Sequence, residues 1–161
     1  MKPPPATKWL GLSLLLIIMD QVSKAAASAW LAPHEPRALL PFLNLTLMHN
    51  QGAAFSFLSE AGGWQRWFFA ALALLVSAVI LWWLLRLPRR ETLTAAGLSL
   101  ILGGALGNVW DRVRLGYVVD FIDVYYGRWH WPAFNIADSA ITIGALLLII
   151  DSLRRRPRAS S

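Results

Sequence analysis

The sequence predicts an all-α membrane protein with four transmembrane helices and a small extracytoplasmic loop region that contains β-structure. Of its 161 residues, 57% are hydrophobic, the mean hydropathy is +0.49, and no sustained polar stretch interrupts the chain. A membrane-spanning helix needs about 20 apolar residues. Stretches near that length occur four times, so we expect one integral membrane domain over residues 1–161, with helices at approximately 9–29, 67–85, 92–110 and 136–150.

Aromatic and basic residues indicate where these helices end and how they are oriented. Tryptophan favours the membrane interface, and the nine Trp residues stand at or close to the predicted helix ends. Lys and Arg are more numerous at the two chain termini and between the second and third helices than in the other two connections. Because cytoplasmic segments carry the excess of basic residues, we expect both termini in the cytoplasm. The net charge of +6 is then a signal of topology and of contact with anionic lipids, and no nucleic-acid partner is expected.

The first predicted helix carries two charged residues and has a competing interpretation. Lys2 and Lys8 followed by an apolar stretch, with residues 27–29 as a small-residue cleavage site, are also typical of a secretory signal peptide. The approach to that cut would be overlong and would contain Asp20 and Lys24, so we favour a retained helix. Asp20 and Lys24 are four residues apart and share a helix face. We favour an ion pair that orders the helix ends over a direct chemical role.

The connection between the first and second helices, residues 30–66, contains a strand-like pattern. In LNLTL, residues 43–47, three leucines alternate with two polar residues, which is the period of a half-buried strand. The turn-like segment Asn50-Gln51-Gly52 follows. Such a strand needs an apolar surface, and the bilayer or the tops of the helices would provide one. An ordinary hairpin cap explains the pattern equally well.

The third predicted helix combines close-packing residues with a polar group at its end. Gly103 and Gly107 have the spacing of small residues that lets membrane helices approach closely. Asn108, Asp111 and Arg112 follow at i, i+3 and i+4, which places an amide, a carboxylate and a guanidinium on one side of the helix. A hydrogen-bonded helix end and a contribution to a functional site are equally good interpretations of this group.

Asp138 lies three residues after Asn135, at the start of the fourth helix. Asn135 as the N-cap and Asp138 at the third helical position would form a capping box, in which a carboxylate also gains from the helix dipole. A second carboxylate, Asp120 or less plausibly Asp123, precedes it in the same connection. Both ends of that connection must reach the same membrane face, so the two acids can meet, although the spacing alone leaves the pair open.

Two neighbouring carboxylates share a proton and can hydrolyse a peptide bond. The ionised member takes a proton from water and the protonated member donates to the carbonyl oxygen, so neither a metal ion nor another cofactor is required. Other common hydrolase signatures are missing from the sequence. It has no Cys, no His-Glu-x-x-His or Gly-x-Ser-x-Gly motif, and no metal-ligand spacing among its histidines, which are His34, His49 and His130.

Five short segments resemble the bacterial lipoprotein signal peptidase family, signal peptidase II, whose members are integral membrane aspartic endopeptidases. Each segment alone is a weak signal, and the five together are highly specific. They occur in the family's order and span nearly the whole chain: DQVSK (20–24), NQGAAF (50–55), GGALGNVWDR (103–112), VVDF (118–121) and FNIADS (134–139).

The resemblance implies a protease that removes the signal peptide of prolipoproteins by cleaving just before the diacylglyceryl-modified cysteine. It implies diacylglyceryl-modified prolipoproteins and membrane lipids as partners, and a multi-pass location in the bacterial cytoplasmic (inner) membrane with the active site toward the periplasm. We expect the chain to function as a monomer. The resemblance maps the catalytic pair onto Asp120 and Asp138. The residues that it implies as substrate-binding or supporting groups are Asn50, Gly52, Asn108, Asp111, Arg112, Asn135, Asp20 and Lys24.

The charge state and the surroundings of this pair can also be predicted. The helix dipole favours an ionised carboxylate at position 138, so we expect Asp138 to hold the charge and Asp120 the shared proton in the free enzyme. Substitutions along the predicted strand should weaken substrate handling more than folding. The groups expected to flank the site and guide the lipid are Leu43, Leu45 and Leu47 of that strand and the aromatic residues Trp64, Trp67, Phe68 and Phe69.

A small transporter or proton-coupled carrier is the main alternative class, because membrane-embedded carboxylates also relay protons or bind cations. Its acids should line a path near the midplane, whereas these acids collect at one membrane face and no inverted repeat is present. A noncatalytic assembly factor that uses its outer loop as a docking surface is a third interpretation.

Overall fold

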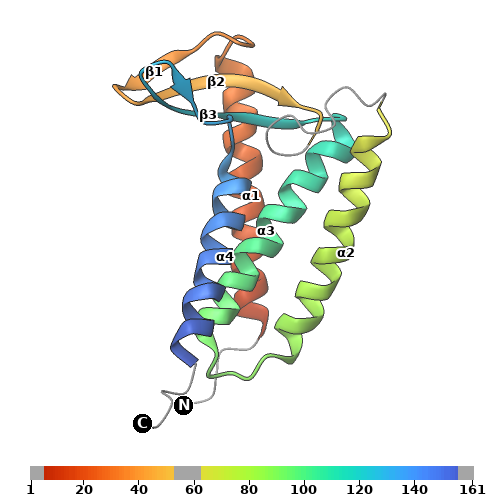
Figure 1. The fold of residues 1–161 in the computed structure, drawn as a ribbon. Coiled ribbons are helices and arrows are strands. Elements are labelled where there is room, and N and C mark those ends of the chain that lie inside the picture. Colours follow the sequence, from red (N-terminus) through yellow and green to blue (C-terminus); the bar gives the residue numbers. More distant parts are fainter. Residues whose placement is uncertain (1–5, 53–62, 156–161) are drawn as a thin grey trace.

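The computed structural model describes residues 6–52 and 63–155 and places four long helices beside a small sheet (Figure 1). We name the end of the bundle that carries the strands the sheet end. The α2–α3 connection lies at the opposite end, where α1 begins and α4 ends. The helices are α1 (Ala6–Trp30), α2 (Gln65–Arg86), α3 (Thr92–Arg114) and α4 (Ile136–Arg155); the strands are β1 (Arg37–Leu40), β2 (Leu43–Asn50), β3 (Val118–Tyr126) and β4 (Trp129–His130).

All four predicted helices are present, and each is long and apolar enough to cross a membrane. The fourth is longer than the predicted range 136–150, because it continues past Asp151 to Arg155. Asp151 does not end the helix, since its carboxylate accepts a hydrogen bond from the hydroxyl of Thr94 in α3. The chain is therefore a multi-pass membrane protein.

The β2 strand confirms the strand that was predicted from the LNLTL pattern, and Leu45 and Leu47 pack in a cluster that includes the end of α1. Leu47 is buried in a cluster with Ala27 and Leu31, at the end of α1, and with Val119 and Phe121 of β3. The tops of the helices thus provide much of the apolar surface that this strand needs.

The sheet itself is antiparallel, with the strand order β1-β2-β3-β4. Its β3 strand lies in the connection between the third and fourth helices, where no strand was predicted. β3 pairs with β2 from Leu43 opposite Val124 to Asn50 opposite Val118, with an irregularity between Leu45 and Met48. The sequence VVDFIDV shows no clear alternation because the first four residues of β3 are all buried, on both faces of the strand.

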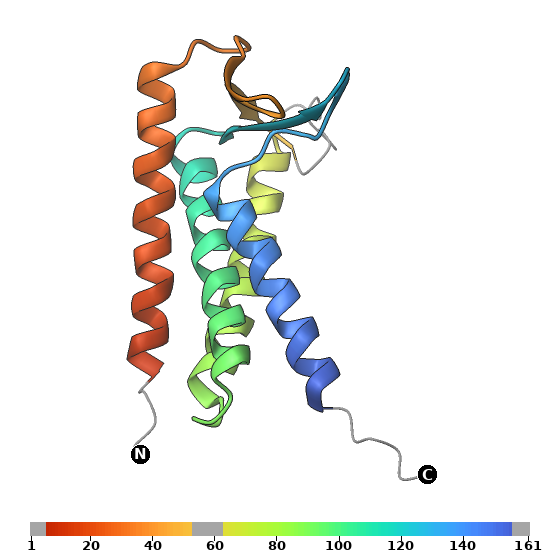
Figure 2. The same cartoon turned by 90° about the vertical axis from the view of Figure 1, so that its left-hand side faces the viewer.

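The helix α3 is central and packs against α1, α2 and α4 (Figures 1 and 2). A Cβ atom added at Gly103 would lie 2.8 Å from the carbonyl oxygen of Ser13 in α1, so the small residue is needed for this approach. At Gly104 the backbone of Ala137 in α4 leaves no room for a side chain. Figure 2 shows that α4 inclines away from α1 toward the opposite end of the bundle. The helices α1 and α4 are therefore nearest to each other near the sheet end, where the predicted site residues are.

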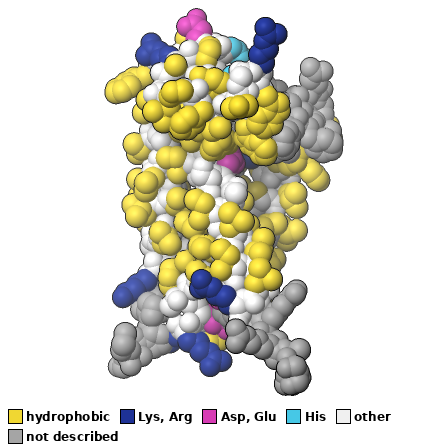
Figure 3. Space-filling view, turned by 60° about the vertical axis from the view of Figure 1, so that its left-hand side comes forward, with side chains coloured by type: hydrophobic (Ala, Val, Ile, Leu, Met, Phe, Trp, Pro, Cys, Tyr) yellow, Lys and Arg dark blue, Asp and Glu magenta, His cyan; other side chains and the backbone are white. Residues whose placement is uncertain are grey.

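The surface of the bundle is consistent with a membrane protein. Figure 3 shows hydrophobic side chains over the flank of the helices and Lys and Arg side chains near the two ends. The exposed basic residues at the opposite end include Arg86, Arg89, Arg90 and Arg154.

Candidate active site

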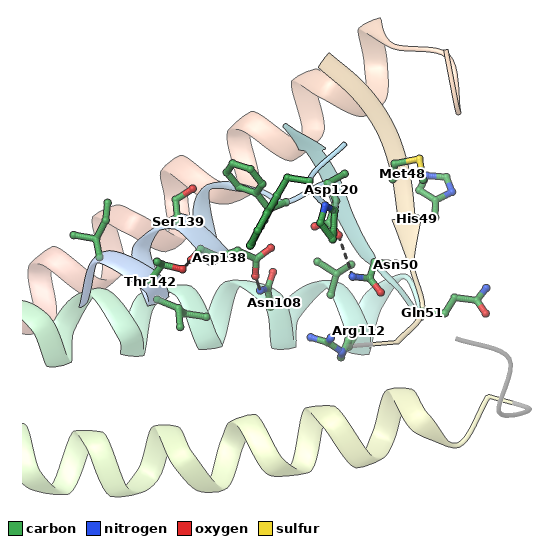
Figure 4. A pocket seen from close by; sticks show the side chains of 17 residues that line it. Met48, His49, Asn50, Gln51, Asn108, Arg112, Asp120, Asp138, Ser139 and Thr142 are labelled. Atoms are coloured by element: carbon green, nitrogen blue, oxygen red, sulfur yellow. Dashed lines mark hydrogen bonds between the residues drawn. The ribbon is translucent and has the colours of Figure 1, made fainter. Parts of the chain in front are cut away.

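A cavity of about 820 Å³ lies at the sheet end, between α3, α4 and the strands (Figure 4). Asp120 and Asp138 both line it, together with Asn108 and Arg112 of α3 and Asn50 of β2. Figure 3 shows acidic atoms in a hollow directly below the sheet. The structure thus brings five of the predicted site residues to one cavity, from four different elements of the chain.

Asp138 is positioned by the first turn of α4. The Oδ1 atom of Asn135 accepts a hydrogen bond from the backbone N–H of Asp138 at 2.9 Å, and Asp138 Oδ2 accepts one from the backbone N–H of Asn135 at 3.3 Å. This is the reciprocal capping box that the spacing predicts. The other oxygen, Asp138 Oδ1, accepts a hydrogen bond from Asn108 Nδ2 at 2.8 Å. Capping therefore occupies only one side of the carboxylate.

Asp120 lies on β3, opposite Met48 of β2, and is only 2% exposed. Its Oδ1 atom accepts a hydrogen bond from Asn135 Nδ2 at 2.7 Å, and its Oδ2 atom accepts one from Asn50 Nδ2 at 3.1 Å. Asn135 therefore donates to both carboxylates, with its side-chain amide to Asp120 and its backbone N–H to Asp138. No solvent reaches Asn135, which is fully buried behind the cavity.

The environment of Asp120 changes its acidity. Burial, together with the charge of Asp138, raises the pKa of the Asp120 carboxyl group from 3.8 to about 7. Hydrogen bonds from Asn50 and Asn135 and the positive charge of Lys24 oppose this shift. The charge of Asp138 acts on Asp120 because both residues line the same cavity. A carboxyl group with this pKa can hold or release a proton near neutral pH.

Arg112 lines the cavity and connects it to the segment after β2. Its Nη2 atom donates a hydrogen bond to the carbonyl oxygen of Gly52 at 3.0 Å, and its guanidinium lies 5.5 Å from the ring centre of Phe69 in α2. The N–H of Gly52 in turn donates to Asn50 Oδ1 at 3.0 Å, which leaves Asn50 Nδ2 for Asp120. Arg112 and Gly52 thus reach Asp120 through Asn50.

Three of the predicted supporting residues lie behind the cavity and do not line it. Lys24 Nζ is 2.8 Å from Asp20 Oδ2 and 2.8 Å from Asp111 Oδ2. The predicted pair of Asp20 and Lys24 is therefore present, and Asp111 extends it to α3. All three side chains are buried.

Asp123, the less favoured partner for Asp138, belongs to the sheet and not to the cavity. Its Oδ2 atom accepts hydrogen bonds from Asn44 Nδ2 and Thr46 Oγ1 at 3.3 and 3.2 Å. Its Oδ1 atom lies 2.8 Å from His130 Nδ1. The polar side of β2 is therefore buried against Asp123, which the half-buried alternation of LNLTL did not predict.

The residues that line the cavity are not the leucines and aromatic residues that were expected to flank the site. None of the three leucines of β2 lines the cavity, and the aromatic residues of α2 reach it only through the contact of Phe69 with Arg112. Sequence reasoning missed the groups that take their place, which come from β2, the segment before α4 and the first turns of α4. They include Met48, Trp131, Phe134, Ser139 and Thr142. Their proximity in sequence to Asn50 and to Asn135 is the signal that could have found them.

The fold and the site define the class of protein. Four membrane-spanning helices and the sheet at one end bring two carboxylates to the same cavity, one from β3 and one from α4, which makes the chain a multi-pass membrane protein with an acidic site beside its sheet. A family model described as signal peptidase (SPase) II matches residues 12–154. The chain belongs to the signal peptidase II family, and it is therefore a peptidase, an enzyme that hydrolyses peptide bonds.

Individual relatives agree with this assignment. A protein named lipoprotein signal peptidase from Acinetobacter baumannii (strain ATCC 17978) is 59% identical over 155 residues, which cover 94% of this chain and 88% of that protein. A protein of the same name from Teredinibacter turnerae is 56% identical over 148 residues, which cover 92% of this chain and 88% of that one. A solved structure described as a bacterial membrane enzyme has a TM-score of 0.83 at 31% identity and covers 96% of this chain and 95% of its own.

Proposed function

We propose that this signal peptidase is an aspartic endopeptidase that uses Asp120 and Asp138 to remove the signal peptide from prolipoproteins. The observation that supports the proposal best is the shared cavity, which both carboxylates line while Asn135 contacts both. The pKa of about 7 for Asp120 agrees with it, since one carboxyl group of such a pair must keep a proton while the other is ionised.

The two carboxyl groups perform the hydrolysis by exchanging protons with water and substrate. Asp138 takes a proton from a water molecule as its oxygen attacks the scissile carbonyl carbon, and Asp120 donates its proton to the carbonyl oxygen. The product is a neutral tetrahedral diol. Asp138 then protonates the leaving nitrogen, the C–N bond breaks, and Asp120 recovers a proton from one hydroxyl group. Each residue returns to its starting state.

We propose that the protein lies in the bacterial cytoplasmic membrane. In the proposed orientation, the sheet end faces the periplasm and both termini are in the cytoplasm. The exposed arginines at the opposite end support it, because cytoplasmic segments carry the excess of basic residues. A cysteine that carries a diacylglyceryl group is held in the outer leaflet by its acyl chains. The bond just before it then stays at the depth of the cavity, and cleavage needs no extraction from the lipid.

The remaining site residues support the pair within a single chain. Asn50, Asn108 and Asn135 donate hydrogen bonds to the two carboxylates. Because all of these groups come from one chain, we propose that residues 1–161 act as one domain and as a monomer. The other proposed supporting groups are Gly52, Arg112, Asp20, Lys24 and Asp111, with membrane lipids as further partners.

The test is cleavage of a lipid-modified precursor by the purified protein in vesicles. Asp120→Asn and Asp138→Asn should each lower kcat by about 10²- to 10⁴-fold while the protein stays folded, because each removes one of the two proton-exchanging groups. Asp123→Asn is the matched control, since Asp123 is a buried aspartate on the same strand that does not line the cavity. Normal cleavage by either active-site variant would exclude the proposed pair.

The location of the shared proton needs a separate measurement. We expect site-resolved carboxyl titration to show Asp120 protonated and Asp138 ionised just below neutral pH. The rate should fall as the pH rises through about 7, because Asp120 then loses the proton that it must donate. Titration curves that show Asp138 protonated and Asp120 ionised would reverse the two roles.

A further inference from the structure

The buried cluster of Asp20, Lys24 and Asp111 takes no part in the proton transfers described above. Lys24 is 3% exposed, Asp20 0% and Asp111 1%, and none of them lines the cavity. Burying charged groups is costly unless each is paired and hydrogen-bonded. Here two carboxylates share a single ammonium. The other hydrogen bonds of these three side chains therefore show which parts of the protein the cluster holds in place.

The ammonium group of Lys24 helps to fix the orientation of Asn108. Each of its three N–H donors has an acceptor: Asp20 Oδ2 at 2.8 Å, Asp111 Oδ2 at 2.8 Å and Asn108 Oδ1 at 2.9 Å. An ammonium can donate but cannot accept, so the oxygen of the Asn108 amide must face Lys24. Its Nδ2 atom is thereby directed to Asp138 Oδ1, 2.8 Å away. Without Lys24, only the hydrogen bond that Asn135 Nδ2 donates to Asn108 Oδ1 at 3.3 Å would oppose the reversed orientation, and the donor to Asp138 would be held less firmly.

The two carboxylates of the cluster hold the backbone next to the catalytic pair. Asp111 Oδ2 accepts a hydrogen bond at 3.2 Å from the N–H of Val119, the residue before Asp120. Asp20 Oδ1 accepts one at 3.0 Å from the N–H of Ala137, the residue before Asp138. Each acid of the cluster thus contacts the chain one residue ahead of one member of the pair.

The side chain of Gln21 links the two acids a second time. Its Nε2 atom lies 2.9 Å from Asp111 Oδ1 and 3.2 Å from Asp20 Oδ2, and it also donates to the carbonyl oxygen of Gly107 at 3.2 Å. The two acids are therefore fixed relative to one another by both an ammonium and an amide.

We propose that Asp20, Lys24 and Asp111 are positioning residues that set the placement of Asp120 relative to Asp138. The inference rests on the proposed function, because the groups that it positions are the proposed catalytic pair. Asp120 is on a strand and Asp138 is on a helix, so their separation depends on how β3 lies relative to α4. The cluster joins the start of β3 and the start of α4 to one ammonium on α1, and the same ammonium orients the amide that donates to Asp138.

Asp111→Asn is the first test, because it leaves Asp20 and Lys24 as a balanced ion pair and should therefore fold. We expect kcat to fall by about 10²-fold, since a small displacement of a reacting group is enough for such a loss. KM for the lipid-modified precursor should stay the same, because Asp111 does not contact the cavity. A higher KM with an unchanged kcat would overturn the proposal.

Lys24→Met is the second test and has a different readout. The charges that act on Asp120 come from Lys24 on α1, Arg112 on α3 and Asp138 on α4, and the charge of Lys24 lowers the Asp120 pKa. In this variant kcat should fall and the pH above which the rate decreases should move upward. The shift follows from the lost charge, whereas the fall in kcat follows from lost positioning, so a shifted pH with normal kcat would contradict the positioning role.

Thr94→Val is the matched control, because it removes a buried hydrogen bond between α3 and α4 at the opposite end of the bundle. It should lower the Tm and leave kcat and the pH profile unchanged. If Asp111→Asn and Lys24→Met behave like Thr94→Val, the cluster only stabilises the fold and the proposal is wrong. Retained cleavage by Asp120→Asn is a different result, since it would disprove the proposed catalytic role of Asp120 and not only the role of the cluster.

Discussion

The two halves of the helix bundle are held together by different interactions. In the half opposite the sheet, Ile80, Leu84, Leu98 and Leu102 form an apolar core. At the sheet end, the space between α1, α3 and α4 is filled by buried acids, amides and an ammonium. Apolar burial stabilises through area and packing, whereas a buried polar network depends on every hydrogen bond being made. We therefore expect stability to depend mainly on the apolar half and the proposed catalysis on the polar half of the same helices.

The largest expected effect tests the polar half. Asn135→Asp keeps an oxygen that can cap the N–H of Asp138, but it removes the amide that donates to Asp120 and Asn108. We expect kcat to fall by about 10²- to 10³-fold, the range for losing one well-placed donor at a reacting group. Cleavage kinetics and thermal unfolding of the same preparation measure the two effects. A lower Tm with normal kcat would show that Asn135 serves stability alone.

A change in the apolar half should lower stability and leave kcat unchanged. Leu98 is 1% exposed, and Leu98→Ala leaves a cavity that should lower the free energy of unfolding by about 3 kcal/mol. At temperatures where the variant is folded, we expect kcat and its pH dependence to match the wild-type values. A change in either one, measured in the same vesicles, would mean that the two halves are not independent.

A smaller effect is expected where the two halves meet. Gly104→Ala would place a methyl group against the backbone of Ala137, next to Asp138, so we expect a loss of about 1 to 3 kcal/mol in unfolding free energy together with a lower kcat. Gly11→Ala is the control, since nothing lies within 4 Å of that position. It should leave kcat unchanged and should not lower stability, because Ala has a higher helix propensity than Gly. Equal losses in the two variants would show that the contact with Ala137 is not responsible.

The smallest predicted effect is a gain in stability. The Asp120 carboxyl group has a pKa of about 7 in the folded protein, against 3.8 as its ordinary value. Between these values the folded protein binds more protons than the unfolded chain, so stability falls as the pH rises, and the full cost is present above about pH 7. Asp120→Asn removes that cost. Its advantage in unfolding free energy should grow from about pH 4 to about pH 8. An advantage that does not change with pH would contradict the raised pKa.

Local patterns predicted much of this structure. Hydropathy located the four helices, and the spacing of Asn135 and Asp138 predicted the capping box. The resemblance to the family pointed to the residues that meet at the cavity. The alternation of LNLTL predicted β2, although the role assigned to its leucines was wrong, because Leu47 is part of the core under the sheet.

The features that sequence reasoning missed depend on contacts between distant segments. β3 shows no alternation because it is buried on both faces. The contact of Lys24 with Asp111 and Asn108 requires α1 and α3 to approach closely, and nothing local to these residues shows that one ammonium serves all three acceptors. A pattern can report which face of an element is buried, but not which partner covers it.

The close approach of Gly104 to Ala137 also determines how a substrate can reach the site. With no room for a side chain between α3 and α4 at that level, we expect no passage for a peptide through this seam. The cavity instead follows α4 past Ser139 to Thr142, which is exposed on the flank of the bundle. A precursor would then arrive by sliding within the plane of the bilayer along α4, so lipid fluidity and crowding, and not desorption from the membrane, would set how often it meets the two acids.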